Sequence, residues 1–145
     1  MTGITKEHEF NGGMKAVFAG LSDYEAYPDY IPGVIKIEVL EPLNSKADLS
    51  VRYELNLIKK FHYTINMYHK GGKEITWELH ESNLMKHNNG HWKLSAGNKK
   101  GTTHAEYSLD LKFKGLVPSA IVKKLTQTSL PAMFEGFQKL IDDKK

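Results

Sequence analysis

The sequence predicts an α+β fold: a curved antiparallel seven-stranded sheet, two short helices after strand 1, and a long C-terminal helix packed across the sheet. Three observations predict it. After residue 34, apolar and polar residues alternate over six stretches, which is typical of strands with one buried face. Short turn signals separate these stretches, which favours an antiparallel meander. Residues 117–141 repeat their apolar side chains at helical spacing, and no other long helix can cover the sheet.

The N-terminal part is predicted to form one strand and two short helices. Residues 4–10 alternate as a strand does, and residues 11–13 end it with an asparagine and two glycines. Residues 14–21 then carry apolar side chains at helical spacing, which predicts a short amphipathic helix. Ser22 and Glu25 fit a capping box, so a second helix is expected to start there, and two nearby prolines keep it short.

The six further strands are predicted from alternation alone. In the first of them, Ile35, Ile37 and Val39 are expected to share one buried face. The first of the six strands is expected to run from Val34 to near Pro42, and the others over residues 49–57, 61–68, 75–80, 91–96 and 104–113.

The segments between these strands carry turn signals of different strength. Lys59 and Lys60 are expected to mark a tight reversal, and the glycine pair at 71–72 predicts a two-residue hairpin turn. Residues 82–90 show no alternation and end in Asn-Gly, so an irregular segment with a turn at Gly90 is expected.

The last helix is expected to run over residues 117–141 with one interruption. Its apolar stripe should face the sheet, and Lys123 and Lys124 should lie on its polar back. Pro118 suits the first turn of a helix. Pro131 lies inside the helix and predicts a kink, because its ring removes one backbone donor and crowds the preceding turn.

Composition excludes several classes of function. There is no cysteine, which excludes disulfides, zinc–thiolate sites and thiol nucleophiles. A net charge of +3 is too small to indicate DNA binding. No apolar run approaches the roughly 18 residues of a membrane span, and the first ten residues lack the apolar core of a secretory signal. We therefore expect a single domain over residues 1–145, cytoplasmic and monomeric.

Several local patterns resemble the START-like superfamily, also called the SRPBCC or polyketide cyclase/dehydrase group, whose fold is the helix-grip (Bet v 1-like) fold. The resemblance is carried by Asp23 with Tyr-Pro-Asp-Tyr-Ile-Pro at 27–32, by Trp-Lys-Leu at 92–94, by Gly-Thr-Thr at 101–103, and by the kinked last helix. Within the superfamily the chain is most similar to the Coq10/RatA-type branch. The resemblance implies a cavity between sheet and helix that holds a lipid, quinone or polyketide-like molecule.

The residues expected to line that cavity are apolar or aromatic. The inward-facing positions of the strands include no Asp, Glu, Lys, Arg or His, whereas catalysis usually needs a tunable acid or base. We therefore predict non-catalytic binding or transport of a hydrophobic small molecule; the plainer alternative is that these side chains only fill a core. The predicted binding residues are Tyr53, Leu55, Tyr63, Ile65, Met67, Trp77, Leu79, Trp92, Leu94, Tyr107, Leu109, Leu125, Met133 and Phe137.

Two other functions stay open. A polyketide cyclase or aromatase would need a charged or histidine group inside the cavity, which a strand bulge at Arg52 or His62 could supply. A RatA-like protein would contact the ribosome, and contact with a membrane surface is a further alternative. The cavity entrance is expected near the short helix and residues 82–90.

No catalytic residue, metal site or cofactor is predicted. The glycine pairs at 12–13 and 71–72 match neither a dinucleotide-binding nor a phosphate-binding loop. No HxH or HExxH spacing occurs, and His62, His80, His91 and His104 all fall on polar strand faces.

Overall fold

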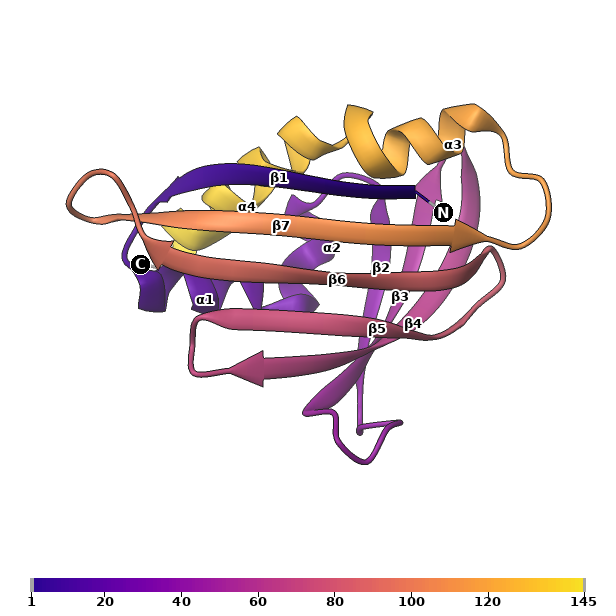
Figure 1. Ribbon diagram of the computed structural model, residues 1–145, viewed down its shortest axis with the longest axis horizontal. Coiled ribbons are helices and arrows are strands. Elements are labelled where there is room, and N and C mark those ends of the chain that lie inside the picture. The colour runs from indigo at the N-terminus through magenta and orange to yellow at the C-terminus, as the bar shows by residue number, and fades with distance from the viewer. Residues whose placement is uncertain (1, 145) are drawn as a thin grey trace.

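The computed structural model describes residues 2–144 and has the architecture that the alternation predicts (Figure 1). One antiparallel sheet of seven strands has the order β1-β7-β6-β5-β4-β3-β2, so every strand from β2 to β7 neighbours the next one along the chain. The strands are β1 (Thr2–Asn11), β2 (Val34–Leu40), β3 (Leu49–Leu57), β4 (Lys59–Lys70), β5 (Glu74–Ser82), β6 (Met85–Ala96) and β7 (Thr102–Phe113).

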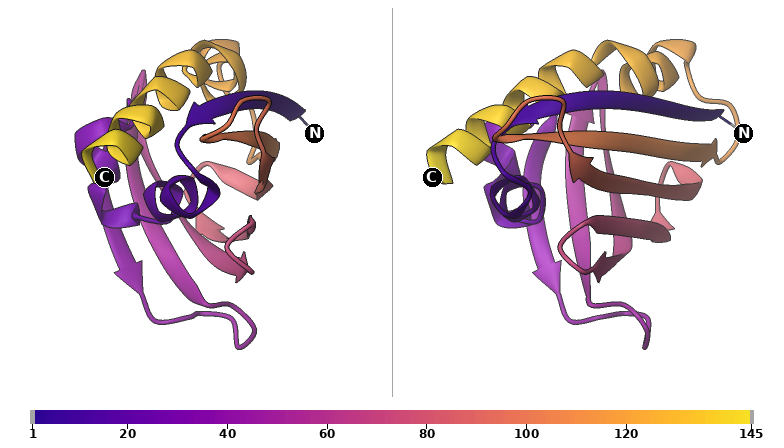
Figure 2. Two further views of the ribbon diagram at one scale, coloured as in Figure 1. Left: turned by 90° about the vertical axis from the view of Figure 1, so that its left-hand side faces the viewer. Right: turned by 60° about the vertical axis from the view of Figure 1, so that its left-hand side comes forward.

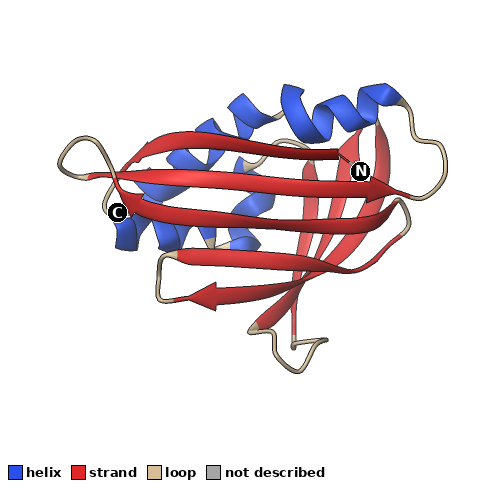
Figure 3. Cartoon of the chain, viewed as in Figure 1, coloured by secondary structure: helices blue, strands red, loops and turns tan. Residues whose placement is uncertain are grey.

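The helices gather on the concave side of the sheet. In Figure 3 the sheet bends so that β1, β7 and β6 cross the direction of β2, β3 and β4. Figure 2 shows the C-terminal helical run lying over the hollow, with the N-terminal helices closing one end. No helix in the described part of the chain is both long enough and apolar enough to cross a membrane. The helical elements are α1 (Met14–Leu21), the 3₁₀ turn η1 (Tyr24–Ala26), α2 (Tyr27–Tyr30), α3 (Ser119–Lys123), the π-helical turn η2 (Lys124–Thr128) and α4 (Leu130–Lys144).

The segment expected to be irregular over residues 82–90 is mostly strand, and that prediction was wrong. The turn takes only Asn83 and Leu84, and β6 begins at Met85. Gly90 lies inside β6 opposite Trp77, and a Cβ at Gly90 would lie 2.3 Å from the Trp77 ring. The glycine therefore makes room for an indole lying flat on the sheet and does not form a turn.

The predicted capping box at Ser22 was also wrong. Ser22 ends α1, and its hydroxyl donates a 2.7 Å hydrogen bond to the carbonyl oxygen of Phe18. The next helical turn, η1, follows Asp23 without any side-chain cap, and Pro28 lies in the first turn of the short helix α2. A serine hydroxyl can donate a hydrogen bond to a carbonyl in the last turn of one helix, or it can cap the start of the next helix. In this structure Ser22 does the first.

Two details of the N-terminal strands also differ from prediction. The apolar face predicted for β2 is only partly buried: Ile35 is 47% exposed and Val39 40% exposed. The reasons are that β2 is an edge strand and that its pairing with β3 shifts at Ile35. The reversal before β4 lies at Ile58, with φ of 76°, and Lys59 already belongs to the strand.

The long C-terminal helix is divided by the π-helical turn η2. The backbone N–H of Ser129 donates to the carbonyl of Lys124, five residues back, at 3.2 Å. Pro131 follows directly and offers no N–H, so the interruption expected from this proline lies in the turn before it. A π-helical turn adds one residue, which rotates the side chains before it relative to those of α4.

Candidate functional site

A cavity of about 130 Å³ lies between the sheet and the C-terminal helix. Its wall comes from the inward faces of β3 to β7, from η2 and α4, and from the N-terminal helices. All but two of the predicted residues line it: Tyr53, Leu55, Tyr63, Ile65, Met67, Trp77, Trp92, Tyr107, Leu109, Leu125, Met133 and Phe137.

Leu79 and Leu94 do not line the cavity. Leu79 pairs with Ile65 but lies beyond Trp77, the last residue of β5 that pairs with β6. Leu94 is buried, but it lies beyond Lys93, the last residue of β6 that pairs with β5. Alternation correctly predicts which face such residues take, but it does not specify their position along the strand relative to a cavity.

Fourteen described residues outside the predicted set also line the cavity, and the polar or aromatic ones among them include Tyr24, Tyr27, Asn88, Lys124 and Ser129. Asn88 fell in the segment misread as irregular. Lys124 was expected on the polar back of the helix, and this prediction was wrong because Lys124 begins the π-helical turn. The segment Tyr-Pro-Asp-Tyr-Ile-Pro at residues 27–32 was used only as part of the family resemblance. It is the sequence signal that could have indicated Tyr27 as a cavity residue.

Aromatic rings pack against one another around the cavity. The rings of Tyr53 and Tyr63, which are paired across β3 and β4, stack at 4.7 Å and 13°. Phe137 from α4 meets Trp92 edge-on at 5.6 Å and Tyr27 edge-on at 5.2 Å. Edge-to-face and offset contacts hold rings more firmly than aliphatic packing does, so these rings give the wall a fixed shape.

Two tyrosine hydroxyls at the N-terminal end of the cavity bond to protein groups. The hydroxyl of Tyr24 lies 2.7 Å from Nε2 of His69, and that of Tyr27 donates to the carbonyl of Leu21. Burial raises the pKa of both tyrosines well above the ordinary value and lowers the pKa of His69. These phenols therefore stay neutral at physiological pH.

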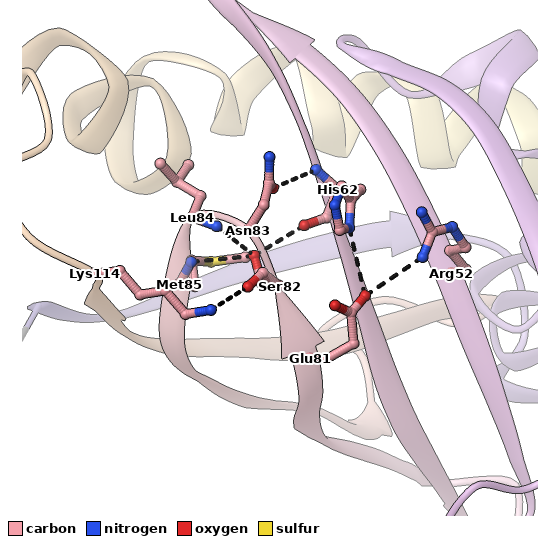
Figure 4. A network of polar contacts seen from close by, with 8 residues as sticks. All are labelled: Arg52, His62, Glu81, Ser82, Asn83, Leu84, Met85 and Lys114. Carbon is pink, nitrogen blue, oxygen red and sulfur yellow. Dashed lines mark hydrogen bonds and ion pairs between the residues drawn. The ribbon is translucent and has the colours of Figure 1, made fainter.

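Arg52 and His62 remain outside the cavity. Both contact Glu81 on the outer face of the sheet, at 3.4 Å for each pair (Figure 4). A bulge does occur nearby, where Thr64 pairs with Glu81 and Ile65 with Leu79, but His80 is the residue it leaves unpaired. The rearrangement that would have placed Arg52 or His62 inside is therefore not present.

Two other histidines of the outer sheet face pair with acids across strands. His91 lies 2.7 Å from Glu106, and His104 lies 3.0 Å from Glu7. Among residues 2–144, no three His, Asp or Glu side chains gather as a metal ion would require.

Comparison with known proteins places the chain in a family. The family described as "Polyketide cyclase / dehydrase and lipid transport" matches residues 14–138. The chain belongs to this family. Its START-like membership agrees with the resemblance in the sequence, whereas the Coq10/RatA-type branch stays a prediction. A comparison with curated proteins found no match.

Solved structures with the same fold come from two bacteria and a plant. A START superfamily protein from Mycobacterium smegmatis has 18% identity and a TM-score of 0.82, with 99% of both chains covered. The Zhui aromatase/cyclase from Streptomyces sp. R1128 has 15% identity and a TM-score of 0.76, covering 99% of this chain and 92% of that one. The ginseng major latex-like protein 151 from Panax ginseng has 7% identity and a TM-score of 0.70, covering 95% of each. At these identities the likeness establishes the helix-grip fold alone.

Proposed function

We propose that this member of the polyketide cyclase/dehydrase and lipid transport family binds a small hydrophobic molecule in its cavity without transforming it. The observation that carries the proposal is the chemistry of the wall. None of the described residues that line it is Asp, Glu, His or Arg, and most are aliphatic or aromatic. Such a wall favours an apolar guest and offers little acid–base chemistry.

The volume of the cavity limits the size of the guest. About 130 Å³ is below the roughly 300–1,000 Å³ of most ligand pockets and close to the roughly 150 Å³ of an engineered cavity that holds benzene. The proposed ligand is therefore one ring or one short branched chain, or the end of a longer molecule whose remainder lies outside. A whole multi-ring polyketide does not fit this wall.

The cavity mouth is proposed at η2. The exposed and half-buried residues of the wall include Pro32, Lys124 and Ser129, which come from the α2–β2 connection and from η2 with the residue after it. The entrance expected at residues 82–90 is not supported, because β6 occupies most of that segment. A π-helical turn is uncommon and often marks a functional site, which suits an opening wall.

The test is binding of single-ring apolar molecules, followed through the fluorescence of Trp77 and Trp92. We expect α-methylstyrene to bind the wild-type protein, and Leu125→Trp to weaken that binding at least about tenfold by filling the cavity. Gln127→Trp is the matched control, because it places the same indole on the same turn at an exposed position. Wild-type protein that binds no such molecule, or a Leu125→Trp variant that binds as tightly, would contradict the proposal.

A cyclase or aromatase is the second candidate, favoured by one observation. Lys124 lines the cavity, and an amine on an apolar wall can polarise a carbonyl group or transfer a proton. This candidate predicts that the protein cyclises a poly-β-ketone thioester faster than buffer does, and that Lys124→Met abolishes the acceleration. The RatA-like ribosome-associated function stays a prediction.

A further inference from the structure

Three tyrosine hydroxyls in the cavity have no hydrogen-bond partner among residues 2–144. They belong to Tyr53, Tyr63 and Tyr107, and all three residues line the wall. The four other tyrosines of the chain do have partners: Tyr24 with His69, Tyr27 with Leu21, Tyr30 with Asp143 and Tyr68 with Glu78. The unpaired hydroxyls are thus concentrated in the cavity.

The oxygens of these three hydroxyls are not fully enclosed by protein. Among the described residues, the only fully buried side-chain nitrogen or oxygen without a hydrogen-bond partner is His62 Nδ1, so none of the three hydroxyl oxygens is sealed against other protein atoms. The other polar group of the indole wall, Trp77 Nε1, is already bonded to Asn88 Oδ1 at 3.1 Å. A buried hydroxyl without a partner is unfavourable, so an occupant with hydrogen-bonding capacity is expected there.

The three side chains come from two parts of the sheet. Tyr53 and Tyr63 stack side by side on β3 and β4, while Tyr107 lies on β7 against Trp92, with ring centres 4.7 Å apart. Burial raises the pKa of all three, and Tyr107 adds to the rise at Tyr53 and Tyr63. The three phenols are therefore neutral, and all three residues line the same cavity.

From this arrangement we propose that Tyr53, Tyr63 and Tyr107 form a polar subsite that binds the carbonyl oxygen of a single-ring aromatic ketone or aldehyde. A carbonyl oxygen only accepts hydrogen bonds, and it has two lone pairs for hydroxyl donors. The cavity volume fits one ring beside the aromatic wall. A carboxylate is disfavoured, because its charge would be desolvated and Lys124, the cation of the wall, lies on the helix side.

This inference rests on the proposed function and specifies its ligand class. It is tested with two molecules of nearly identical shape, acetophenone and α-methylstyrene, which differ in having C=O or C=CH₂ on the ring. We expect the wild-type protein to bind acetophenone about tenfold or more tightly than α-methylstyrene, measured by calorimetry.

Tyr→Phe variants identify the groups responsible. Tyr53→Phe, Tyr63→Phe and Tyr107→Phe each keep the ring and remove the hydroxyl. We expect at least one of them to lose most of the preference for acetophenone, with its affinity for α-methylstyrene changed by less than about twofold. Tyr30→Phe is the control, since its hydroxyl bonds to Asp143 on the surface, and it should keep the full preference. Near-ultraviolet circular dichroism checks that each variant is folded.

The outcomes separate the inference from the function on which it depends. Equal affinity of the wild type for both molecules overturns the polar subsite and leaves apolar binding intact. A preference that survives in all three Tyr→Phe variants also overturns the subsite. If neither molecule binds, the subsite and the proposed function both fall.

Discussion

Replacing Gly90 with alanine tests whether the indole of Trp77 lies flat on the sheet. A Cβ at Gly90 would lie 2.3 Å from Trp77 Cζ2 and 2.5 Å from the carbonyl oxygen of Ser108, whereas ordinary contact begins at 3.4 Å. The ring could tilt away, into the cavity, but the Ser108 oxygen belongs to the backbone of β7 and cannot move without disturbing the ladder. Both contacts therefore oppose the substitution.

The expected magnitude follows from two opposing effects. Overpacking a buried site of this kind costs about 1–3 kcal/mol. Replacing glycine with alanine gains about 0.4–1 kcal/mol by restricting the unfolded chain. We therefore expect Gly90→Ala to lower the free energy of unfolding by about 1–2 kcal/mol, which corresponds to a melting temperature lower by about 2–8 °C. Urea unfolding followed by far-ultraviolet circular dichroism measures the first quantity, and calorimetry the second.

Two further substitutions test whether packing against Trp77 is the cause of the destabilisation. Gly13→Ala is the control, because a Cβ there meets nothing within 4 Å, and its stability should stay within about 0.5 kcal/mol of wild type. Gly90→Asn separates packing from turn chemistry, since asparagine tolerates the left-handed backbone of a turn but is larger than alanine. We expect Gly90→Asn to be at least as destabilised as Gly90→Ala. A Gly90→Asn protein as stable as wild type would refute the packing argument and restore the turn.

Two other predictions concern stability. Burial lowers the pKa of His69 in the folded state below its ordinary value of 6.5, so the folded state binds fewer protons than the unfolded state. The contribution of His69 to stability should therefore be complete above pH 6.5 and fall as the pH drops below it. Urea unfolding at pH 5.5 and 7.5 measures this fall, and His69→Asn should make it smaller. A variant whose free energy of unfolding falls between these pH values as much as that of the wild type would contradict the assignment. Ser50 is fully buried, accepts from the Leu43 N–H at 2.9 Å and donates to Asn66 Oδ1 at 2.7 Å. Ser50→Ala should cost about 1–3 kcal/mol because both partners lose their bond, and a loss below 0.5 kcal/mol by the same method would show that water replaces it.

Periodicity was sufficient to predict which side chains face inward. Tyr53 and Leu55 on β3 are buried as their alternation requires, because successive residues of a strand point to opposite faces whatever its partners are. Phe137 lines the cavity because its place in the apolar stripe follows from 3.6 residues per helical turn. These are properties of the local backbone, so the sequence alone determined the sheet, the covering helix and twelve of the 26 described residues of the wall.

Contacts between segments far apart in the sequence determined the features that periodicity did not predict. Gly90 was read as a turn residue because its partner, the Trp77 ring, is thirteen residues away on another strand. Lys124 reaches the cavity because the chain forms a π-helical turn there, and the helical period carries no sign of the extra residue. The volume of about 130 Å³ is the small difference between the space under a curved sheet and the side chains that fill it. Such a difference depends on bulges, strand order and helix placement together, which is why only the tertiary structure determines it.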